Sequence, residues 1–328
     1  MTRRTLSVGK YRALQRASTP GGHFTILALD HSDALRRAMR PDAPASVTSD
    51  ELTAFKTQVV GALAPHTSGV LLDPIYGAAQ AVCGGQVRGV GLLVELEKAD
   101  YQLQTMPLAC EVLPGWSVSK IKRMGADGVK LFYYYDPESV TLCAAQNTLV
   151  QSVGAACAAD DIPFYAEPIL TGVDGQASDN DSFTTRLIVA AQRAADSGAD
   201  ILKLEFPLPL SAQADDERCR EACLRLTESL DVPWVLLSAG VSFEAFCRQV
   251  AIACAAGASG YIAGRAVWGE AAAIRDRSQR QAWLETVGQD RLRRLAQIAA
   301  RGRPWTDVIA CEPITTSWYQ TYAEGTQA

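Results

Sequence analysis

The chain has 328 residues, of which 48% are hydrophobic and 20% are charged. That is enough apolar material for one large core or two medium ones, and it excludes a disordered protein. The formal net charge of −5 at pH 7 gives no sign of the basic surface that nucleic-acid binding requires. Residues 1–19 contain basic side chains but no apolar stretch as long as that of a signal peptide or a membrane span. We therefore expect a cytoplasmic protein without nucleic-acid or membrane partners.

Short apolar runs alternate with longer amphipathic segments along the chain, which indicates repeated strand and helix units and a parallel sheet. The predicted strands span residues 24–29, 69–73, 87–95, 128–132, 163–167, 201–204, 234–237 and 260–263. The predicted helices span residues 50–65, 117–124, 137–160, 184–197, 215–230, 243–256 and 268–301. Eight such units predict an α/β fold of the (β/α)8 TIM-barrel type.

A Gly-Ala pair precedes three of the predicted strands, at 125–126, 198–199 and 257–258. Glycine that ends a helix just before a buried strand is typical of short αβ loops, and the repeat favours a barrel over a doubly wound sheet. No linker-like segment divides the chain. We expect one barrel domain over residues 1–328, with an N-terminal extension at 1–22 and a C-terminal helical tail at 268–328. A polar insertion at 172–182 is expected above the catalytic face.

The nine cysteines lie mostly in Ala-rich apolar stretches, as is typical of buried thiols and not of a disulfide framework. Cys219 and Cys223 are spaced like one helical turn, with no histidine nearby to complete a zinc site. The three histidines are His23, His31 and His66, too few and too scattered for the histidine-rich ligand set of a catalytic metal. We expect neither a metal nor another cofactor.

Polar residues follow the predicted strands, at the end of a barrel where active sites form. In chain order they are Asp30, His31, Asp73, the segment 95–98, Lys130, Glu167, Lys203, the turn 238–240, Gly264 and Arg265. His31 is expected at the mouth, where it contacts substrate or serves a structural role.

Lys203 is the most specific of these residues. Alternation along residues 201–205 turns Lys203 toward the barrel interior, while Leu202 and Leu204 face the helices. The same alternation points Lys130 and Glu167 inward on neighbouring strands. An ammonium that is desolvated and close to another ammonium loses its proton more readily, and the free amine attacks carbonyls. The alternative is that these charges form only an interior ion-pair network.

Two turns after the last predicted strands contain small residues that let the backbone approach a ligand. They are Ser-Ala-Gly at 238–240 and Gly-Arg at 264–265. Barrels frequently bind phosphate at this position through backbone N–H groups and a helix N-terminus, and Arg265 adds a fork of donors. These turns therefore predict a phosphate site.

Taken together, residues 24–268 resemble the tagatose 1,6-diphosphate aldolase family and its relatives, the sulfofructose-phosphate aldolases. The segments that carry the resemblance are Leu-Ala-Leu-Asp at 27–30, Leu-Leu-Asp-Pro at 71–74, Glu-Lys-Ala-Asp-Tyr at 97–101, Gly-Val-Lys-Leu at 128–131, Leu-Lys-Leu-Glu at 202–205, Leu-Ser-Ala-Gly-Val at 237–241 and Gly-Arg-Ala-Val-Trp at 264–268. The resemblance implies a TIM barrel and a class I aldolase.

The resemblance also implies roles for individual residues. Lys203 becomes the Schiff-base lysine and Glu167 the carboxylate that moves protons, while Lys130 and Asp30 act on the C4 hydroxyl region. Four residues are expected to bind the phosphate of the substrate: Ser238, Gly240, Gly264 and Arg265. His31 and Lys98 are also expected to bind substrate.

The chain departs from the family after the first strand, where Asp30 is followed by His31, Ser32 and Asp33 and the family usually has Gln and then a charged residue. A second departure is Glu-Pro-Ile-Leu at 167–170, where a more apolar run is usual. Because the distal group of the ketose is expected near the first of these loops, it is open whether that group is a phosphate, a sulfonate or uncharged.

We expect metal-free cleavage of a phosphorylated ketose, such as tagatose 1,6-bisphosphate, to dihydroxyacetone phosphate and an aldehyde. The alternatives are a sulfofructose 1-phosphate aldolase, a transaldolase or barrel isomerase that uses the same lysine, and a non-catalytic regulator that senses a metabolite. The expected partner is a small phosphorylated sugar, and we expect a homo-oligomer.

The scarcity of histidine leads to a test of metal independence. Exhaustive chelation should leave ketose-phosphate cleavage unchanged, because no nitrogen-rich ligand set for a catalytic zinc is expected. Cleavage rates are measured before and after treatment with chelator. A loss of activity that zinc or another divalent ion restores contradicts this expectation.

Overall fold

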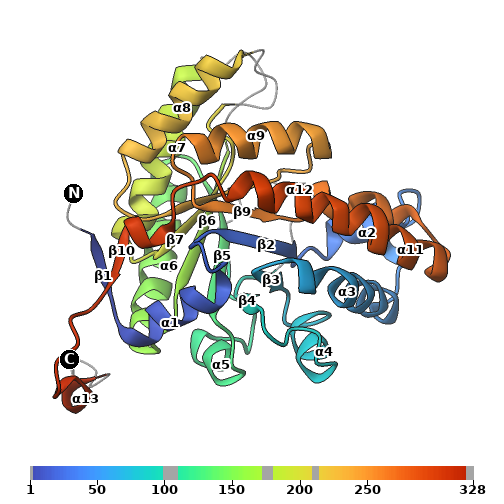
Figure 1. The fold of residues 1–328 in the computed structure, drawn as a ribbon, viewed down its shortest axis with the longest axis horizontal. Helices are drawn as coiled ribbons and strands as arrows, with labels where there is room; N and C mark the ends of the chain where they lie inside the picture. Colours follow the sequence, from blue (N-terminus) through green and yellow to red (C-terminus); the bar gives the residue numbers. More distant parts are fainter. Residues whose placement is uncertain (1–2, 99–109, 172–179, 209–213, 323–328) are drawn as a thin grey trace.

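Eight parallel strands close into a barrel, as predicted (Figure 1). The computed structural model describes residues 3–98, 110–171, 180–208 and 214–322. The barrel strands are β2 (Phe24–Leu29), β3 (Gly69–Leu72), β4 (Gly91–Glu95), β5 (Gly128–Tyr135), β6 (Phe164–Leu170), β7 (Ile201–Leu204), β8 (Trp234–Leu237) and β9 (Gly260–Ala263). Each strand pairs with the next, and β9 closes the barrel on β2. This confirms the TIM-barrel fold.

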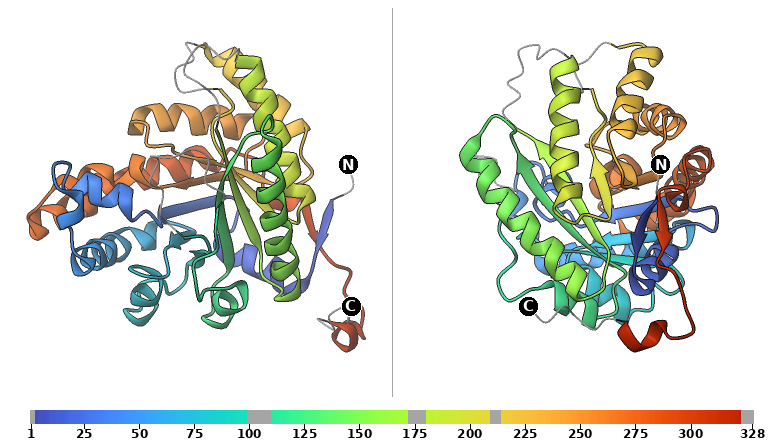
Figure 2. Two further views of the ribbon diagram at one scale, coloured as in Figure 1. Left: turned by 180° about the vertical axis from the view of Figure 1, so that it is seen from behind. Right: turned by 90° about the vertical axis from the view of Figure 1, so that its left-hand side faces the viewer.

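Helices surround the strands, as the two further views show (Figure 2). They are α2 (Asp33–Met39), α3 (Ser49–Leu63), α4 (Ala78–Cys83), α5 (Val118–Arg123), α6 (Val140–Ala159), α7 (Asn180–Asp196), α8 (Asp216–Glu228), α9 (Phe243–Ala255), α10 (Arg265–Trp268), α11 (Arg277–Trp283) and α12 (Gln289–Ala299). Among the described residues, no helix combines the length and the apolar character that crossing a membrane requires.

Alternation along the strands divides the core into two apolar regions. The side chains that point outward pack against the helices, and Leu202 and Leu204 of β7 belong to this outer region. The inward side chains fill the lower part of the barrel, and they include Ile26, Tyr165 and Ile201. The charged groups of the predicted site lie at the C-terminal ends of the strands, beyond this apolar layer.

The two ends of the chain meet at the other end of the barrel. Strand β1 (Arg4–Leu6) pairs in parallel with β10 (Ile309–Cys311), so the tail that was predicted to be helical also contains a strand. Helix α1 (Val8–Ala17) packs at the start of the barrel strands, where Lys10 Nζ lies 2.8 Å from Asp200 Oδ2. A Cβ at position 91 would come within 2.4 Å of Ala17 Cα, so Gly91 is required for this contact. The N-terminal end of the barrel is thus covered.

Several predicted boundaries were wrong. Residues 87–90 form turns and not strand, because Gly89 adopts a φ of +81°. Strands β5 and β6 run past their predicted ends to Tyr135 and Leu170, since they pair with each other over their full length. The predicted helix at 268–301 is interrupted by a 3₁₀ segment at Gly269–Ala273 and a π segment at Leu284–Gly288.

Some sequence predictions fall wholly or partly outside the described residues. These are most of the insertion at 172–182 and the last three positions of the Glu-Lys-Ala-Asp-Tyr segment.

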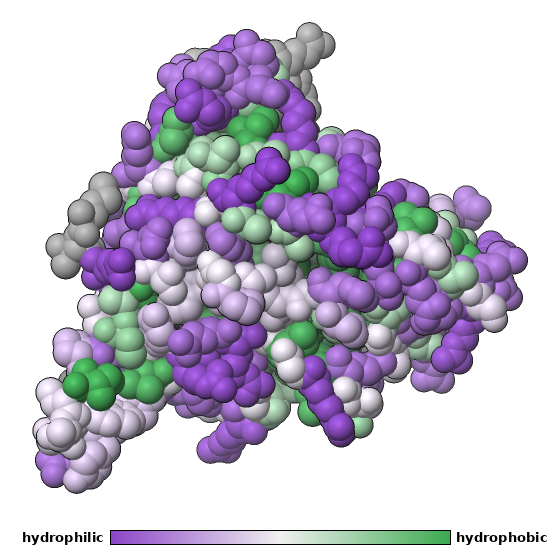
Figure 3. All heavy atoms as spheres, in the orientation of Figure 1, coloured by the Kyte–Doolittle hydropathy of each residue, from purple (hydrophilic) through white to green (hydrophobic). Residues whose placement is uncertain are grey.

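All nine cysteines are free thiols. The face of the molecule drawn in Figure 3 is largely hydrophilic, with apolar residues gathered in small patches. The predicted homo-oligomer stays a prediction.

Candidate active site

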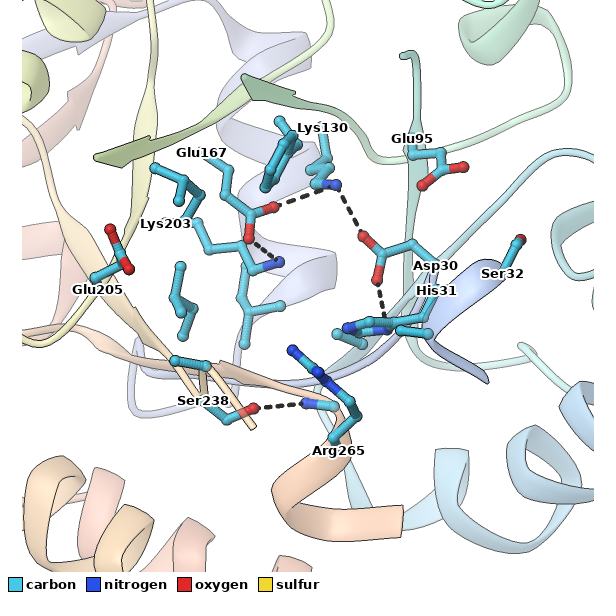
Figure 4. Close-up of a pocket in the computed structure, with 18 of the residues that line it drawn as sticks. Asp30, His31, Ser32, Glu95, Lys130, Glu167, Lys203, Glu205, Ser238 and Arg265 are labelled. Carbon is cyan, nitrogen blue, oxygen red and sulfur yellow. Dashed lines mark hydrogen bonds and ion pairs between the residues drawn. The ribbon is translucent and has the colours of Figure 1, made fainter. Parts of the chain in front are cut away.

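A cavity of about 310 Å³ opens at the C-terminal ends of the barrel strands. It brings together side chains from most of the strands, as Figure 4 shows. Eight of the ten predicted site residues line it: Asp30, His31, Lys130, Glu167, Lys203, Ser238, Gly264 and Arg265. The expectation that polar strand ends meet at one site therefore agrees with the geometry.

Glu167 lies between the two lysines (Figure 4). Its Oε1 is 2.7 Å from Lys203 Nζ and its Oε2 is 3.2 Å from Lys130 Nζ. The three side chains lie on the consecutive strands β7, β6 and β5, and they are at most 8% exposed. One carboxylate can thus exchange a proton with either amine without any movement of the backbone.

Lys130 is surrounded by carboxylates. Its Nζ lies 2.9 Å from Asp30 Oδ2, and it also contacts Glu167 and Glu97. Lys203 forms its ion pair with Glu167. Among the described residues, Lys130 therefore forms ion pairs with more carboxylates than Lys203 does.

Asp30 and His31 lie at the end of β2 and differ in their charge. Burial alone would raise the pKa of Asp30, but Lys130 and Lys203 outweigh it and hold that pKa well below its usual value. Burial lowers the pKa of His31 to about 3, against the opposing effect of Asp30. Near neutral pH the site therefore contains an ionised Asp30 beside a neutral imidazole, with Oδ1 and Nδ1 3.3 Å apart.

The two predicted phosphate turns lie side by side. The backbone N–H of Gly264 donates to Ser238 Oγ at 3.4 Å. Ala239 and Gly240 both have positive φ, at 45° and 76°, which turns the backbone sharply after β8. A Cβ at position 240 would approach the Arg265 guanidinium carbon to 3.1 Å. The absence of a side chain at Gly240 therefore leaves room for the guanidinium of Arg265. Gly240 is not itself among the described residues that line the cavity.

Lys98 is the predicted site residue that lies apart from the others. Its side chain is exposed, and it is not among the described residues that line the cavity. Strand β4 ends at Glu95, and the backbone N–H of Lys98 bonds instead to Glu111 O at 2.8 Å. Its role in substrate binding stays a prediction. Asp73 also turns away from the cavity, because it forms a buried ion pair with Lys56.

Helix α2 contributes to the site, which was not predicted. This helix follows directly after His31 and contributes Arg37 to the cavity. The segment 33–39 is a run of good helix formers, and that was the available signal. Four further residues line the cavity without having been given an individual role from the sequence: Glu95, Glu205, Phe132 and Tyr134.

Comparison with known proteins agrees with this geometry. A profile of the DeoC/LacD family aldolases matches residues 24–270. The chain belongs to this family. Tagatose 1,6-diphosphate aldolase 2 of Streptococcus mutans is 31% identical over 93% of this chain and 99% of its own length. Tagatose 1,6-diphosphate aldolase of Listeria monocytogenes is 30% identical over 92% of this chain and 94% of its own.

Solved structures of other aldolases share the fold of this DeoC/LacD-family chain. Fructose-bisphosphate aldolase from Plasmodium falciparum superposes with a TM-score of 0.71 at 13% identity, over 92% of this chain and 99% of that one. Fructose-bisphosphate aldolase from Slackia heliotrinireducens has a TM-score of 0.61 at 14% identity, over 88% and 89%. At such low identity the likeness extends to the barrel fold alone.

Glu205 differs from the ion-paired carboxylates of the site. Burial raises its pKa to about 7; a hydrogen bond from Leu170 N at 3.1 Å opposes that shift, and the Glu167 carboxylate adds to it. Between pH 4.5 and about pH 7 the folded protein holds this proton more tightly than the unfolded chain does. The contribution of this proton to the stability of the fold is therefore fully present below about pH 4.5 and is lost as the pH rises through about 7.

We predict that Glu205→Gln, which cannot ionise, escapes this loss. As the pH rises from about 5 to about 8, the free energy of unfolding of the variant minus that of the wild type should increase by on the order of 2 kcal/mol. Urea unfolding at several pH values measures the difference. Glu217→Gln is a surface control that should show no such change across this range, since the pKa of Glu217 is lowered. A constant difference for Glu205→Gln at every pH contradicts the assignment.

Proposed function

We propose that the protein is a class I, Schiff-base aldolase that cleaves a phosphorylated ketose to dihydroxyacetone phosphate and an aldehyde. One observation carries the proposal: Lys203 Nζ lies 2.7 Å from Glu167, inside a cavity that is also lined by Ser238, Gly264 and Arg265. These residues can donate hydrogen bonds to a phosphate. The tagatose 1,6-diphosphate aldolases among the relatives support a ketose phosphate of that kind.

The first step joins the substrate to the enzyme. Glu167 accepts a proton from Lys203, and the free amine adds to the C2 carbonyl to form a carbinolamine. Glu167 then returns a proton to the departing hydroxyl, so that water leaves and an iminium forms. The iminium accepts the electron pair of the C3–C4 bond far more readily than the carbonyl does, which lowers the barrier to cleavage.

Cleavage requires a base at the C4 hydroxyl. Asp30 is suited to this role because the two lysines keep it ionised, and Lys130 is held beside it at 2.9 Å to position the same hydroxyl. As the C4 hydroxyl loses its proton, the C3–C4 bond breaks, the aldehyde leaves and an enamine stays on Lys203. The proton that Asp30 has taken passes by way of Lys130, which contacts both carboxylates, to Glu167. Glu167 protonates the enamine carbon, and hydrolysis of the resulting iminium restores the Lys203 amine and releases dihydroxyacetone phosphate.

The position of the proposed phosphate site supports Lys203 over Lys130 as the nucleophile. Strand β7, which bears Lys203, pairs with β8, and the Ser238 turn follows β8. Lys130 lies on β5, on the far side of β6. The ketone carbon is close to the phosphate ester in the substrate, so the attacking amine must lie near the phosphate site to reach attack geometry. Arg265 and the backbone of the two turns then bind the phosphate.

An ion-pair network with no catalytic role would also bury these charges. Such networks contribute little net stability, and a network that served only stability would not require an adjoining cavity. The cavity of about 310 Å³ and the donors beside it favour catalysis.

We predict that Lys203→Met abolishes both turnover and borohydride trapping of dihydroxyacetone phosphate, since it removes the nucleophile. Lys130→Met should cripple cleavage, by on the order of a hundredfold or more, yet still give an adduct. Peptide mass mapping of the reduced adduct locates the modified lysine. An adduct on Lys130 in the unmutated protein, or trapping that persists in Lys203→Met, overturns the mechanism.

Arg265→Ala tests the phosphate site separately from the covalent chemistry. The substitution removes a charged fork of donors, so KM for the phosphorylated ketose should rise steeply, by on the order of tenfold to a hundredfold. Trapping of unphosphorylated dihydroxyacetone on Lys203 should change much less. Equal losses with the phosphorylated and the unphosphorylated compound rule out this role for Arg265.

A further inference from the structure

Glu95 is a buried carboxyl group to which the proposed mechanism assigns no task. It ends strand β4, is 3% exposed and lines the cavity. Lys130, Glu167, Lys203 and Asp30 are all held by ion pairs. The carboxyl of Glu95, by contrast, forms no hydrogen bond or ion pair within the described part of the chain. A buried polar group in this state is costly unless a ligand completes its hydrogen bonds.

The surroundings of Glu95 disfavour negative charge. Burial and then the neighbouring Glu97 raise the pKa of Glu95 well above its usual value, Lys130 opposes them, and Asp30 and Asp73 add to the rise. These surroundings therefore favour the neutral carboxylic acid, a form that can donate one hydrogen bond and accept others.

Glu95 lies at the end of the cavity opposite the phosphate site (Figure 4). Going round the barrel from the Ser238 turn, the strands present Lys203, Glu167, Lys130 and then Glu95. A ketose that has its phosphate at Arg265 and its C2 at Lys203 extends toward Lys130 with C4, so its far end points toward Glu95. Ser32, a hydroxyl residue, lies on the same side of the cavity.

Arg37 is the other cation that could bind a second anionic group. Burial lowers the pKa of Arg265, Asp30 opposes that shift, and the positive charge of Arg37 adds to it. The charge of Arg37 therefore acts on the phosphate site.

We propose that Glu95 binds the far end of the substrate as an uncharged hydroxyl group, so that the preferred substrate is a ketose 1-phosphate without a second phosphate or a sulfonate. This inference rests on the proposed function and specifies its substrate class. The acid donates to the terminal sugar hydroxyl and accepts from it, whereas an anionic group there meets the carboxylates of Glu97 and Asp30.

The test compares kcat/KM for three kinds of substrate: fructose and tagatose 1-phosphates, the corresponding 1,6-bisphosphates, and 6-sulfofructose 1-phosphate. The wild type should prefer a 1-phosphate. Glu95→Ala should lose about tenfold in kcat/KM for the 1-phosphates and little or nothing for the substrates that carry a second anionic group. The preference of the variant for the 1-phosphates should therefore be smaller than that of the wild type. Glu95→Gln retains a neutral hydrogen-bonding group and should keep the wild-type preference.

Glu205→Gln is the matched control, because Glu205 is another carboxyl with a raised pKa that lines the same cavity but lies on the side of Lys203. Its ratio of activities between the substrates should equal that of the wild type. A wild-type preference for a bisphosphate or a 6-sulfonate overturns the inference, and so does a Glu95→Ala variant that loses equally on all substrates.

Borohydride trapping with dihydroxyacetone phosphate distinguishes this inference from the proposed function, since that compound lacks the distal half of the ketose. If the wild type traps no dihydroxyacetone phosphate, the proposed function fails and this inference fails with it. If the wild type is trapped on Lys203 but shows none of the expected preference for the 1-phosphates, only the role of Glu95 is refuted.

Discussion

Glu167 stands between two ammonium groups, 2.7 Å from Lys203 and 3.2 Å from Lys130, and the rest of the site is organised around this arrangement. Charges this deeply buried persist only when they are paired, because each loses the solvation that water supplies. Asp30 and Glu97 complete the neutralisation around Lys130. Among the described residues, the ion pair of Lys203 is with Glu167, which is also the group that can take its proton.

The barrel makes such a cluster possible by separating apolar from polar layers. Inward side chains such as Ile26 and Ile201 fill the lower interior, and the pairing of β1 with β10 covers the end nearby. The layer at the C-terminal strand ends is not filled by these apolar side chains, and it accommodates the charges of the site. Because β5, β6 and β7 are neighbours in the barrel, the inward side chains of Lys130, Glu167 and Lys203 meet at hydrogen-bonding distance.

The cavity is asymmetric along its length, and the asymmetry gives the substrate a direction. One end contains backbone donors and the guanidinium of Arg265, which suit an anion. The other contains Glu95, whose surroundings disfavour negative charge. Between them lie the nucleophile and the groups that move protons. A molecule with one anionic end, a ketone beside it and hydroxyls beyond matches this order of chemical environments.

The sequence by itself determined the features that depend on local periodicity and turn chemistry. Period-two alternation was sufficient to place Lys203 inward and Leu202 and Leu204 outward, and the glycines after β8 and β9 marked the turns. Tertiary structure alone decided which charges meet. Lys130 contacts Glu97, Asp73 turns away to Lys56, Arg37 reaches the cavity from a helix that was not predicted, and Glu95 lines the cavity. These outcomes depend on how the closed barrel sets its strands and helices against one another, and no local pattern records pairings between residues on separate elements.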